Sequence, residues 1–246
     1  MKQLQKLNAF QIKLIIAVLM LLDHLRMIQG FIPPTLGSII VIVSRCVAPM
    51  FAYLAVEGIR HTRNRNRYLL RLLIWASVML AGNIILNSIF NHFAGMISRD
   101  SQVNTNISNH VVLTLALGVF CIIQIDRGKE SGSRYRLIHY ILAAMCFIVG
   151  FALEWGTIIL PFMLVVYYFR NNRMYRYIGY GIIEIFALLI SFSEPFYFLV
   201  FPLILLYNGQ RGPNNAFAKK FFYIFYPAHI WCIAIINFII IYARGT

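Results

Sequence analysis

Nine apolar segments follow one another along this chain, and the polar breaks between them are too short to fold as separate water-soluble domains. The chain is 60% hydrophobic and only 12% charged, with a mean hydropathy of +0.73. An ordinary soluble domain carries about a quarter charged residues. We therefore predict an all-α, polytopic transmembrane helix bundle that forms a single integral-membrane domain over residues 1–246.

A membrane-spanning helix needs about 20 apolar residues. On that length, the sequence predicts helices near residues 9–28, 36–58, 68–90, 110–125, 137–153, 155–169, 177–192, 196–208 and 221–242. The first segment carries Asp23, His24 and Arg26 and has no evident small-residue cleavage site. We therefore expect this segment to remain in the protein as a span, and not to be removed as a signal peptide.

Basic residues alternate between the two sides of the predicted bundle. Of the 22 Lys and Arg residues, 17 lie at the start of the chain or in the breaks after the second, fourth, sixth and eighth segments. Because cytoplasmic loops carry the excess of Lys and Arg, this alternation predicts about nine spans with a cytoplasmic amino terminus. The net charge of +14 does not indicate nucleic acid, since the basic residues form no single arm or recognition helix.

Several common chemistries lack their usual residues in this chain. The four cysteines lie singly in apolar segments, with no CxxC spacing and no adjacent histidine, so we interpret them as packing residues and predict no metal site. The sequence has no Walker-type loop, no HExxH and no nucleophile elbow. It therefore gives no support for ATP hydrolysis, zinc proteolysis or serine hydrolysis.

Asp23 and His24 stand together inside the first apolar segment. Ionisable residues within a membrane are costly, so they face a polar cavity, pair with another group or take part in chemistry. A neutral histidine is a competent general base near neutral pH, and a neighbouring aspartate can orient it. The alternative is structural: Asp23 pairs with a buried arginine such as Arg45, while His24 bonds a neighbouring helix.

Two further segments carry polar residues. Arg45 lies near the middle of the second segment, and Pro49 removes the amide that would bond residue 45, which would loosen the helix there. Glu57 and His61 are four residues apart and share a helix face, which suits either a proton relay or simple capping at the membrane rim. Tyr226 and His229 share a face of the last segment, although a lone histidine in a helix is more often a packing residue.

The run RHTRNRNRYLLR, from residue 60 to residue 71, is strongly electropositive. Arginine offers forked donors to phosphate, so a nucleotide-bearing donor such as coenzyme A could dock here. Retention of the loop in the cytoplasm and contact with anionic lipid headgroups would leave the same pattern, and composition alone favours that reading. The candidate phosphate-binding residues of this run are Arg60, His61, Arg63, Arg65, Arg67 and Arg71, and the same two readings apply to Lys219 and Lys220.

Five blocks resemble the TraX family of conjugal-transfer and related bacterial membrane proteins. They are NAFQIKLIIAVLMLLDHLR, SRCVAPMFAYLAVEGIRHT followed by RYLLRLLIWA, VLTLALGV, PLILLYNGQRG and KKFFYIFYPAHIW, and together they extend over most of the chain. The founding activity of that family is acetylation of the amino terminus of a pilin subunit. Its arrangement is similar to that of multispanning acyltransferases, which use acetyl-CoA and a membrane histidine.

The resemblance implies an acetyl-CoA-dependent N- or O-acetyltransferase of the bacterial cytoplasmic (inner) membrane, with several passes and no metal. It implies membrane lipids, acetyl-CoA and a peptide, glycan or lipid acceptor as partners, and no nucleic acid. Carried onto this chain, its polar positions are Asp23, His24, Arg45, Glu57, Arg71, Asn208, Arg211, Tyr226 and His229. Acetyl transfer through an acetyl-histidine and direct transfer both fit these residues.

Two other functions remain open on the residues alone. A transporter or flippase would use Asp23, His24, Arg45 and Glu57 as a path for protons or anionic lipid. A structural component of an envelope or conjugation apparatus would use the same residues to tie helices together.

The predicted topology can be tested at the end of the chain. Nine spans with a cytoplasmic amino terminus place residue 246 outside the cytoplasm. We expect a periplasmic reporter enzyme fused after Thr246 to be active and a cytoplasmic reporter at the same site to be inactive. The reverse result would contradict the topology.

Overall fold

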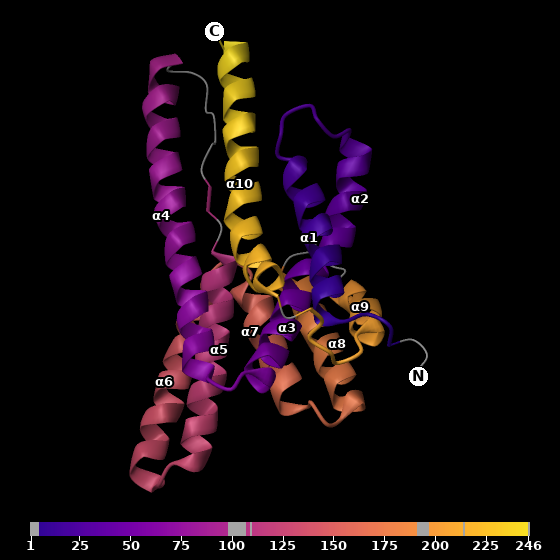
Figure 1. The fold of residues 1–246 in the computed structure, drawn as a ribbon, viewed down its shortest axis with the longest axis vertical. Helices are drawn as coiled ribbons and strands as arrows, with labels where there is room; N and C mark the ends of the chain where they lie inside the picture. Colours follow the sequence, from indigo (N-terminus) through magenta and orange to yellow (C-terminus); the bar gives the residue numbers. More distant parts are fainter. Residues whose placement is uncertain (1–4, 98–106, 109, 191–196, 214, 246) are drawn as a thin grey trace. The chain divides into compact units, whose positions relative to one another are not determined.

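The structure is a computed structural model that describes residues 5–97, 107–108, 110–190, 197–213 and 215–245, apart from the side chains of residues 94–97, 133, 190, 216, 219, 244 and 245. Within these ranges the chain is helical and has no β-strand (Figure 1). Each of the nine predicted segments falls mainly on helix, and residues 191, 192 and 196 of the seventh and eighth segments lie outside the described residues. The all-α prediction is confirmed.

Five segments of the described chain are long and apolar enough to cross a membrane, so the molecule is a membrane protein. These are Pro34–His61, Arg65–Phe93, Val111–Glu130, Arg134–Phe151 and Lys220–Ala243. Gly156–Tyr168 and Tyr197–Leu206 are apolar but shorter. The count of nine spans and the cytoplasmic amino terminus stay predictions.

The chain divides into two compact units, each assembled from separate segments. Unit 1 comprises the described parts of Met1–Val47, Val78–Asn109 and Leu205–Thr246. Unit 2 comprises the described parts of Ala48–Ser77 and His110–Ile204. Helix α4 (Arg65–Ile97) contributes to both. The single integral-membrane domain expected from the sequence stays a prediction.

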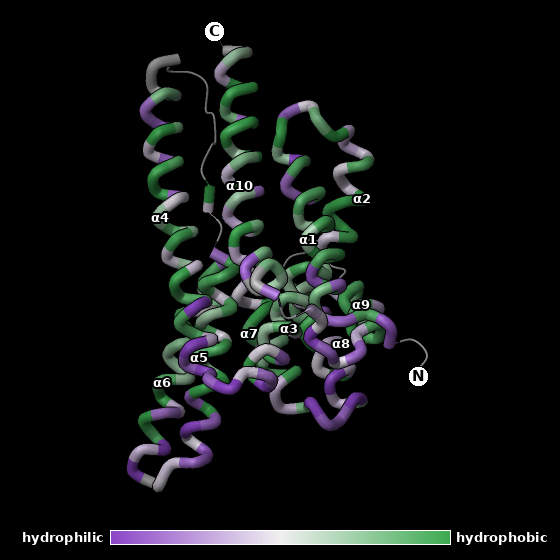
Figure 2. Tube along the Cα trace, in the orientation of Figure 1, coloured by the Kyte–Doolittle hydropathy of each residue, from purple (hydrophilic) through white to green (hydrophobic). Residues whose placement is uncertain are grey.

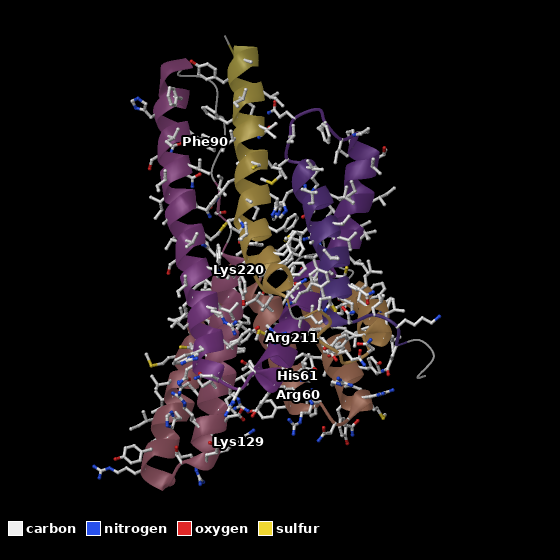
Figure 3. All side chains as sticks on the ribbon, in the orientation of Figure 1. Arg60, His61, Phe90, Lys129, Arg211 and Lys220 are labelled. Atoms are coloured by element: carbon white, nitrogen blue, oxygen red, sulfur yellow. The ribbon has the colours of Figure 1, made fainter. Side chains whose placement is uncertain are left out.

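Unit 1 contains α1 (Ala9–Leu25), α2 (Pro34–Ser44), the second part of α4 and α10 (Ala216–Gly245). Helix α1 packs against α2 and α10. The apolar core between α4 and α10 includes Met79, Phe90 and Ile230, and the Phe90 ring stacks on Phe238 with centroids 4.5 Å apart (Figure 3). Beside this core the indole of Trp231 donates from Nε1 to Asn83 Oδ1 over 3.0 Å.

A short backbone pairing joins the start of α1 to the segment that precedes α10. The Leu7 amide donates to the Leu206 carbonyl at 3.0 Å, and the Asn208 amide donates to the Leu7 carbonyl at 2.9 Å. Asn8 then caps α1, since its Oδ1 accepts from the Gln11 amide at 3.0 Å. Gly212 lies directly against this cap: a Cβ there would come 2.5 Å from Asn8 Oδ1.

The predicted helix over residues 36–58 is interrupted. The structure has α2 up to Ser44, a turn at Arg45 and Cys46, and then α3 (Val47–His61). Pro49 explains the place of the break, because it has no amide to donate to the carbonyl of residue 45 and its ring crowds that carbonyl. The Arg45 amide bonds the Ile42 carbonyl, three residues back, at 3.3 Å.

Unit 2 contains most of α3, the first part of α4, α5 (Val111–Glu130), α6 (Ser133–Phe151), α7 (Gly156–Tyr168), α8 (Arg173–Ile190), a short 3-10 helix (Tyr197–Leu199) and most of α9 (Val200–Leu206). Helices α5 and α6 form a hairpin, and α7 packs against α5 and α8. Hydrophilic residues gather at the turn between α5 and α6 and ahead of α8 (Figure 2).

Glycine and a capping carboxylate make the close packing of unit 2 possible. A Cβ on Gly118 of α5 would lie 2.5 Å from the Met163 sulfur of α7. Glu154, between α6 and α7, accepts from the His110 amide at 2.6 Å and so caps the start of α5. Burial raises the pKa of the Glu154 carboxyl above its ordinary value.

The close contact between α4 and α10 leaves no room for a side chain at Gly82. A Cβ there would lie 2.0 Å from Cζ2 of Trp231, whose ring is held by its bond to Asn83. We expect Gly82→Ala to lower the unfolding free energy by about 1–3 kcal/mol, through overpacking. The measurement is thermal unfolding of the purified protein in detergent.

The matched control is Gly37→Ala in α2, where a Cβ would have no atom within 4 Å. Alanine is the better helix former, so this variant should be unchanged or gain up to about 1 kcal/mol. Equal melting temperatures for Gly82→Ala and Gly37→Ala would contradict the packing argument.

Candidate functional site

Two histidines meet in unit 1, one from α1 and one from α10. The ring centroids of His24 and His229 are 5.1 Å apart, with the ring planes at 75°, in an edge-to-face arrangement. His24 is half-buried and His229 is only 7% exposed. The sequence marked both residues separately, and the structure places their rings side by side.

Each imidazole is fixed by the backbone of its own helix. His24 Nδ1 lies 2.7 Å from the Met20 carbonyl, and His229 Nδ1 lies 2.7 Å from the Phe225 carbonyl. Because a carbonyl only accepts, Nδ1 carries the proton in both rings and, in the neutral form, Nε2 carries the lone pair. In each ring, therefore, Nε2 is the nitrogen that is available as a base.

The Nε2 atom of His229 is buried and has no hydrogen-bond partner among the described residues. The Phe225 ring stacks on His229 with centroids 4.6 Å apart and interplanar angle 11°, so the imidazole is held from one face as well as through Nδ1. Buried polar atoms usually have a hydrogen-bond partner. The unpartnered Nε2 of His229 therefore keeps its lone pair, and the His24 ring lies next to the His229 ring.

Asp23 does not make the orienting bond to His24 that the sequence suggested. It accepts from Nε of Arg26 at 2.9 Å, in a partly exposed ion pair within α1. Asp23 is also not the partner of Arg45 that the structural alternative expected. The carboxylate remains close enough to act on His24 through its charge, while the Met20 carbonyl sets the ring's orientation.

The other two candidates in unit 1 are Arg45 and Tyr226. Tyr226 lies one turn before His229, with ring centroids 6.0 Å apart, and packs against the apolar core of unit 1. Arg45 is half-buried in the turn after α2. Nearby, Ser44 donates from Oγ to the Leu19 carbonyl of α1 at 3.2 Å, which ties the end of α2 to the helix that carries His24.

Asn208 and Arg211 belong to the segment that pairs with the start of α1. Asn208 Oδ1 accepts from the Gln210 amide at 2.8 Å, which forms a local turn, and Gly209 follows with φ of +78°. The turn explains why Asn and Gly occupy these positions. It needs a short side chain that accepts a hydrogen bond at residue 208 and a residue that adopts a left-handed backbone conformation at residue 209. Arg211 is exposed (Figure 3).

Lys13 is a basic residue of unit 1 that the sequence treated only as a topology signal. Its Nζ lies 5.4 Å from the centroid of the Phe222 ring, and its charge is near that of Arg211. Lys220 is exposed on the first turns of α10 (Figure 3). The side chain of Lys219 lies outside the part of the chain that the structure describes. The sequence signal that could have identified Lys13 as a candidate is its position inside an apolar helix, four residues after the helix begins at Ala9.

Glu57 belongs to unit 2. Its Oε1 accepts from Arg60 Nη1 at 2.5 Å, and its Oε2 lies 3.4 Å from His61 Nε2. Arg60 and His61 lie on the last turn of α3 (Figure 3) and Glu57 lies one turn before His61, so the predicted shared face of Glu57 and His61 is confirmed. The guanidinium of Arg60 is therefore already paired with the Glu57 carboxylate.

The remaining arginines of the basic run differ in what they contact. Arg65 Nη1 bonds Asp126 Oδ2 of α5 at 2.6 Å, and Tyr167 donates to the other oxygen of the same carboxylate. Arg71 donates to the Arg67 carbonyl at 3.3 Å. Arg63 and Arg67 are exposed and have no carboxylate partner among the described residues. The structure therefore leaves Arg63 and Arg67 as the residues of this run most available to an anion.

Among the described residues, no group of three or more His, Cys, Asp or Glu side chains lies close enough together to hold a metal ion.

Comparison with known proteins matches residues 9–237 to the family described as TraX protein. A relative from Dichelobacter nodosus, named "Probable fimbrial assembly protein FimC, serogroup H1", is 25% identical over 244 residues, which cover 91% of this chain and 93% of that protein. No solved structure matches the chain at a significant level.

The backbone bonds of the two imidazoles predict their tautomers. We expect both His24 and His229 to carry the proton on Nδ1 when neutral, because only that nitrogen faces a carbonyl. Nitrogen NMR of histidine-labelled protein at mildly alkaline pH measures this directly, with His92→Ala, His24→Ala and His229→Ala used for assignment. A signal from Nε2–H for either residue would contradict the geometry.

Proposed function

The chain belongs to the TraX protein family, and we propose that it is a membrane-embedded acetyltransferase that moves an acetyl group from cytoplasmic acetyl-CoA to an amine or hydroxyl acceptor at the membrane. The observation that carries this proposal is the His24–His229 pair. In both imidazoles Nδ1 bonds a backbone carbonyl, so that Nε2 is the basic nitrogen, and both rings lie in the same unit. Such a pair is suited to moving protons during acyl transfer.

His24 acts as the general base in the proposed reaction. Its Nε2 takes a proton from the acceptor as the acceptor nitrogen or oxygen attacks the thioester carbonyl. The tetrahedral intermediate then collapses, the carbon–sulfur bond breaks, and the proton on His24 passes to the departing coenzyme A thiolate. His229 offers a second lone pair beside this imidazole and so stabilises the proton while it resides on His24.

The developing oxyanion requires a hydrogen-bond donor. Arg45 and Tyr226 lie in the same unit as the histidines and are the proposed donors. Tyr226 is the better supported of the two, since its ring lies 6.0 Å from that of His229. Asp23 contributes through charge, and not as the partner that orients His24. A transient acetyl-histidine on His24 is an alternative route for the same two substrates.

Each unit contains its own candidate set of residues for the coenzyme phosphates. In unit 1, Lys13 joins Arg211, Lys219 and Lys220 from the sequence prediction. Lys13 precedes His24 by about 16 Å along α1, a distance that a long, flexible thioester arm can bridge. In unit 2, the exposed Arg63 and Arg67 are favoured over Arg60 and Arg65, whose guanidinium groups are bonded to carboxylates.

The acceptor is proposed to be a peptide amino terminus, a glycan or a lipid. The relative's printed name concerns fimbrial assembly, which favours a peptide of a fimbrial or pilus apparatus. The proposed location is the bacterial cytoplasmic membrane, with several passes and a cytoplasmic amino terminus. That orientation gives the basic loop of residues 60–71 access to cytoplasmic acetyl-CoA.

Replacing His24 tests the reaction. We expect the purified protein to transfer or hydrolyse the acetyl group of radiolabelled acetyl-CoA. His24→Ala should lower that rate by at least about 100-fold, the usual contribution of a general base. The measurement is label released or transferred per unit time, with thermal unfolding as the check on folding.

The matched control is His92→Ala, which removes an exposed imidazole of α4 in the same unit. It should leave the rate unchanged. Equal rates for His24→Ala and the unmodified protein would remove His24 from the mechanism. Failure of the unmodified protein to bind acetyl-CoA would favour a transporter or a structural component instead.

A further inference from the structure

Four rings form a row along the first half of α10. The row consists of Phe217, Phe221, Phe225 and His229, which follow one another at intervals of four residues and so lie on neighbouring turns of the helix. Successive ring centroids are 5.1, 5.5 and 4.6 Å apart, and the last two contacts are stacked, with interplanar angles of 22° and 11°. The row ends at the imidazole that lies beside His24.

Exposure falls from the first ring of this row to the last. Phe217 is 62% exposed, whereas Phe221 and Phe225 are half-buried. His229 is only 7% exposed. Twelve residues of helix separate Phe217 from His229, which is roughly 18 Å along the axis. The row therefore leads from an exposed ring at the start of α10 to the buried histidine.

The middle of the row is held in place, while its first ring is free on one side. Phe222 lies edge-to-face against Phe221, with centroids 4.9 Å apart, and also edge-to-face against Phe10 of α1, at 5.8 Å. The Nζ atom of Lys13 lies 5.4 Å from the centroid of the Phe222 ring. Among the described rings only Phe221 contacts Phe217. One face of the exposed Phe217 ring is therefore open to a ligand.

The surroundings of the row are basic. Lys220 follows Phe217 by three residues, on the same side of α10, and is exposed (Figure 3). Asp23 is the only carboxylate side chain in the described part of unit 1, and Arg26 already bonds it at 2.9 Å. Neither Lys220 nor Lys13 therefore has an acidic partner within the described part of the chain.

An exposed ring beside such a cation suits a planar base that carries phosphate. A base stacks on an aromatic face, and an ammonium group bonds phosphate oxygens. A membrane-surface anchor would have a different composition, because the aromatic belts at that surface consist of Trp and Tyr, whose polar atoms reach water. The first three rings of the row are phenylalanine and have no polar atom. A nucleotide therefore fits this place better than a lipid headgroup.

We propose that Phe217 and Lys220 bind the nucleotide of coenzyme A, and that the rest of the row guides its thioester arm to His24 and His229. The adenine stacks on Phe217, and the Lys220 ammonium bonds the phosphates. This inference rests on the proposed acetyl transfer and deepens it by assigning the donor nucleotide to unit 1. The row also gives the acetyl group a route from the exposed start of α10 to the histidine pair.

Binding to the full-length purified protein, in nanodiscs of neutral phosphatidylcholine, tests this site with two ligands. One is coenzyme A, and the other is adenosine diphosphate, which has the base and phosphates but no thiol arm. We expect Phe217→Ala to weaken binding of both ligands by about 5- to 100-fold, because it removes the stacking face. Phe217→Trp keeps an aromatic face and should stay within about 3-fold of the unmodified protein. Lys220→Gln should weaken binding by about 3- to 10-fold.

The matched control for the ring is Phe31→Ala, which removes a phenylalanine of unit 1 with nearly the same exposure, 61%. The control for the charge is Arg134→Gln, at an exposed position of α6. Both should leave the affinity unchanged. Thermal unfolding without ligand checks that Phe217→Ala and Phe31→Ala are equally well folded, as expected for two exposed rings.

Unchanged coenzyme A affinity in Phe217→Ala would contradict the proposal, and loss of affinity in Arg63→Gln instead would assign the nucleotide to unit 2. A second titration replaces part of the phosphatidylcholine with phosphatidylglycerol. If Phe217→Ala and Lys220→Gln alter only the thermal stabilisation by that lipid, the row binds lipid and the proposal is wrong.

The same variants separate this site from the transfer reaction. Coenzyme A binding that depends on Phe217, without any acetyl transfer, would support the site and contradict the proposed function. Acetyl transfer with an unchanged KM in Phe217→Ala would support the function and contradict the site. Failure of the unmodified protein to bind coenzyme A would contradict both.

Discussion

The backbone pairing of residues 7–9 with residues 206–210 places the start of α1 next to the segment that leads into α10, and the histidine site depends on it. From there the two helices run in the same direction, since contacts between Phe10 and Phe222, His24 and His229, and Gln29 and Asn237 follow one another in order. Without it, nothing in the sequence would set His24 beside a residue 205 positions away.

His24, His229 and Asp23 find hydrogen-bond partners close to them in the chain. Each of the two histidines bonds the carbonyl four residues earlier, and Asp23 bonds Arg26 three residues later. A helix that satisfies its own polar groups can enter an apolar bundle at low cost. Nε2 of His229 has no such partner among the described residues, because the helix directs only Nδ1 back to the backbone. The proposed acetyl transfer uses the lone pairs of the two imidazoles on Nε2.

The secondary structure followed closely from the sequence, because apolar length and turn residues are local signals. Within the described residues the nine predicted segments fall mainly on helix, and the break at Arg45 lies where Pro49 removes a backbone bond. The shared face of Glu57 and His61 also followed from helical spacing alone. Local signals did not reveal that Asp23 would choose Arg26 over His24, since both lie within reach and only the side-chain geometry of α1 decides between them.

The amino-acid sequence was enough to predict an all-helical membrane protein, the approximate positions of its helices and the residue types from which a site could be built. Those properties depend on hydrophobicity and on contacts within a few residues. Only the three-dimensional packing showed that His24 meets His229 and that Arg65 bonds Asp126. Both pairings join residues far apart in the chain, and packing, which no local pattern encodes, selects them.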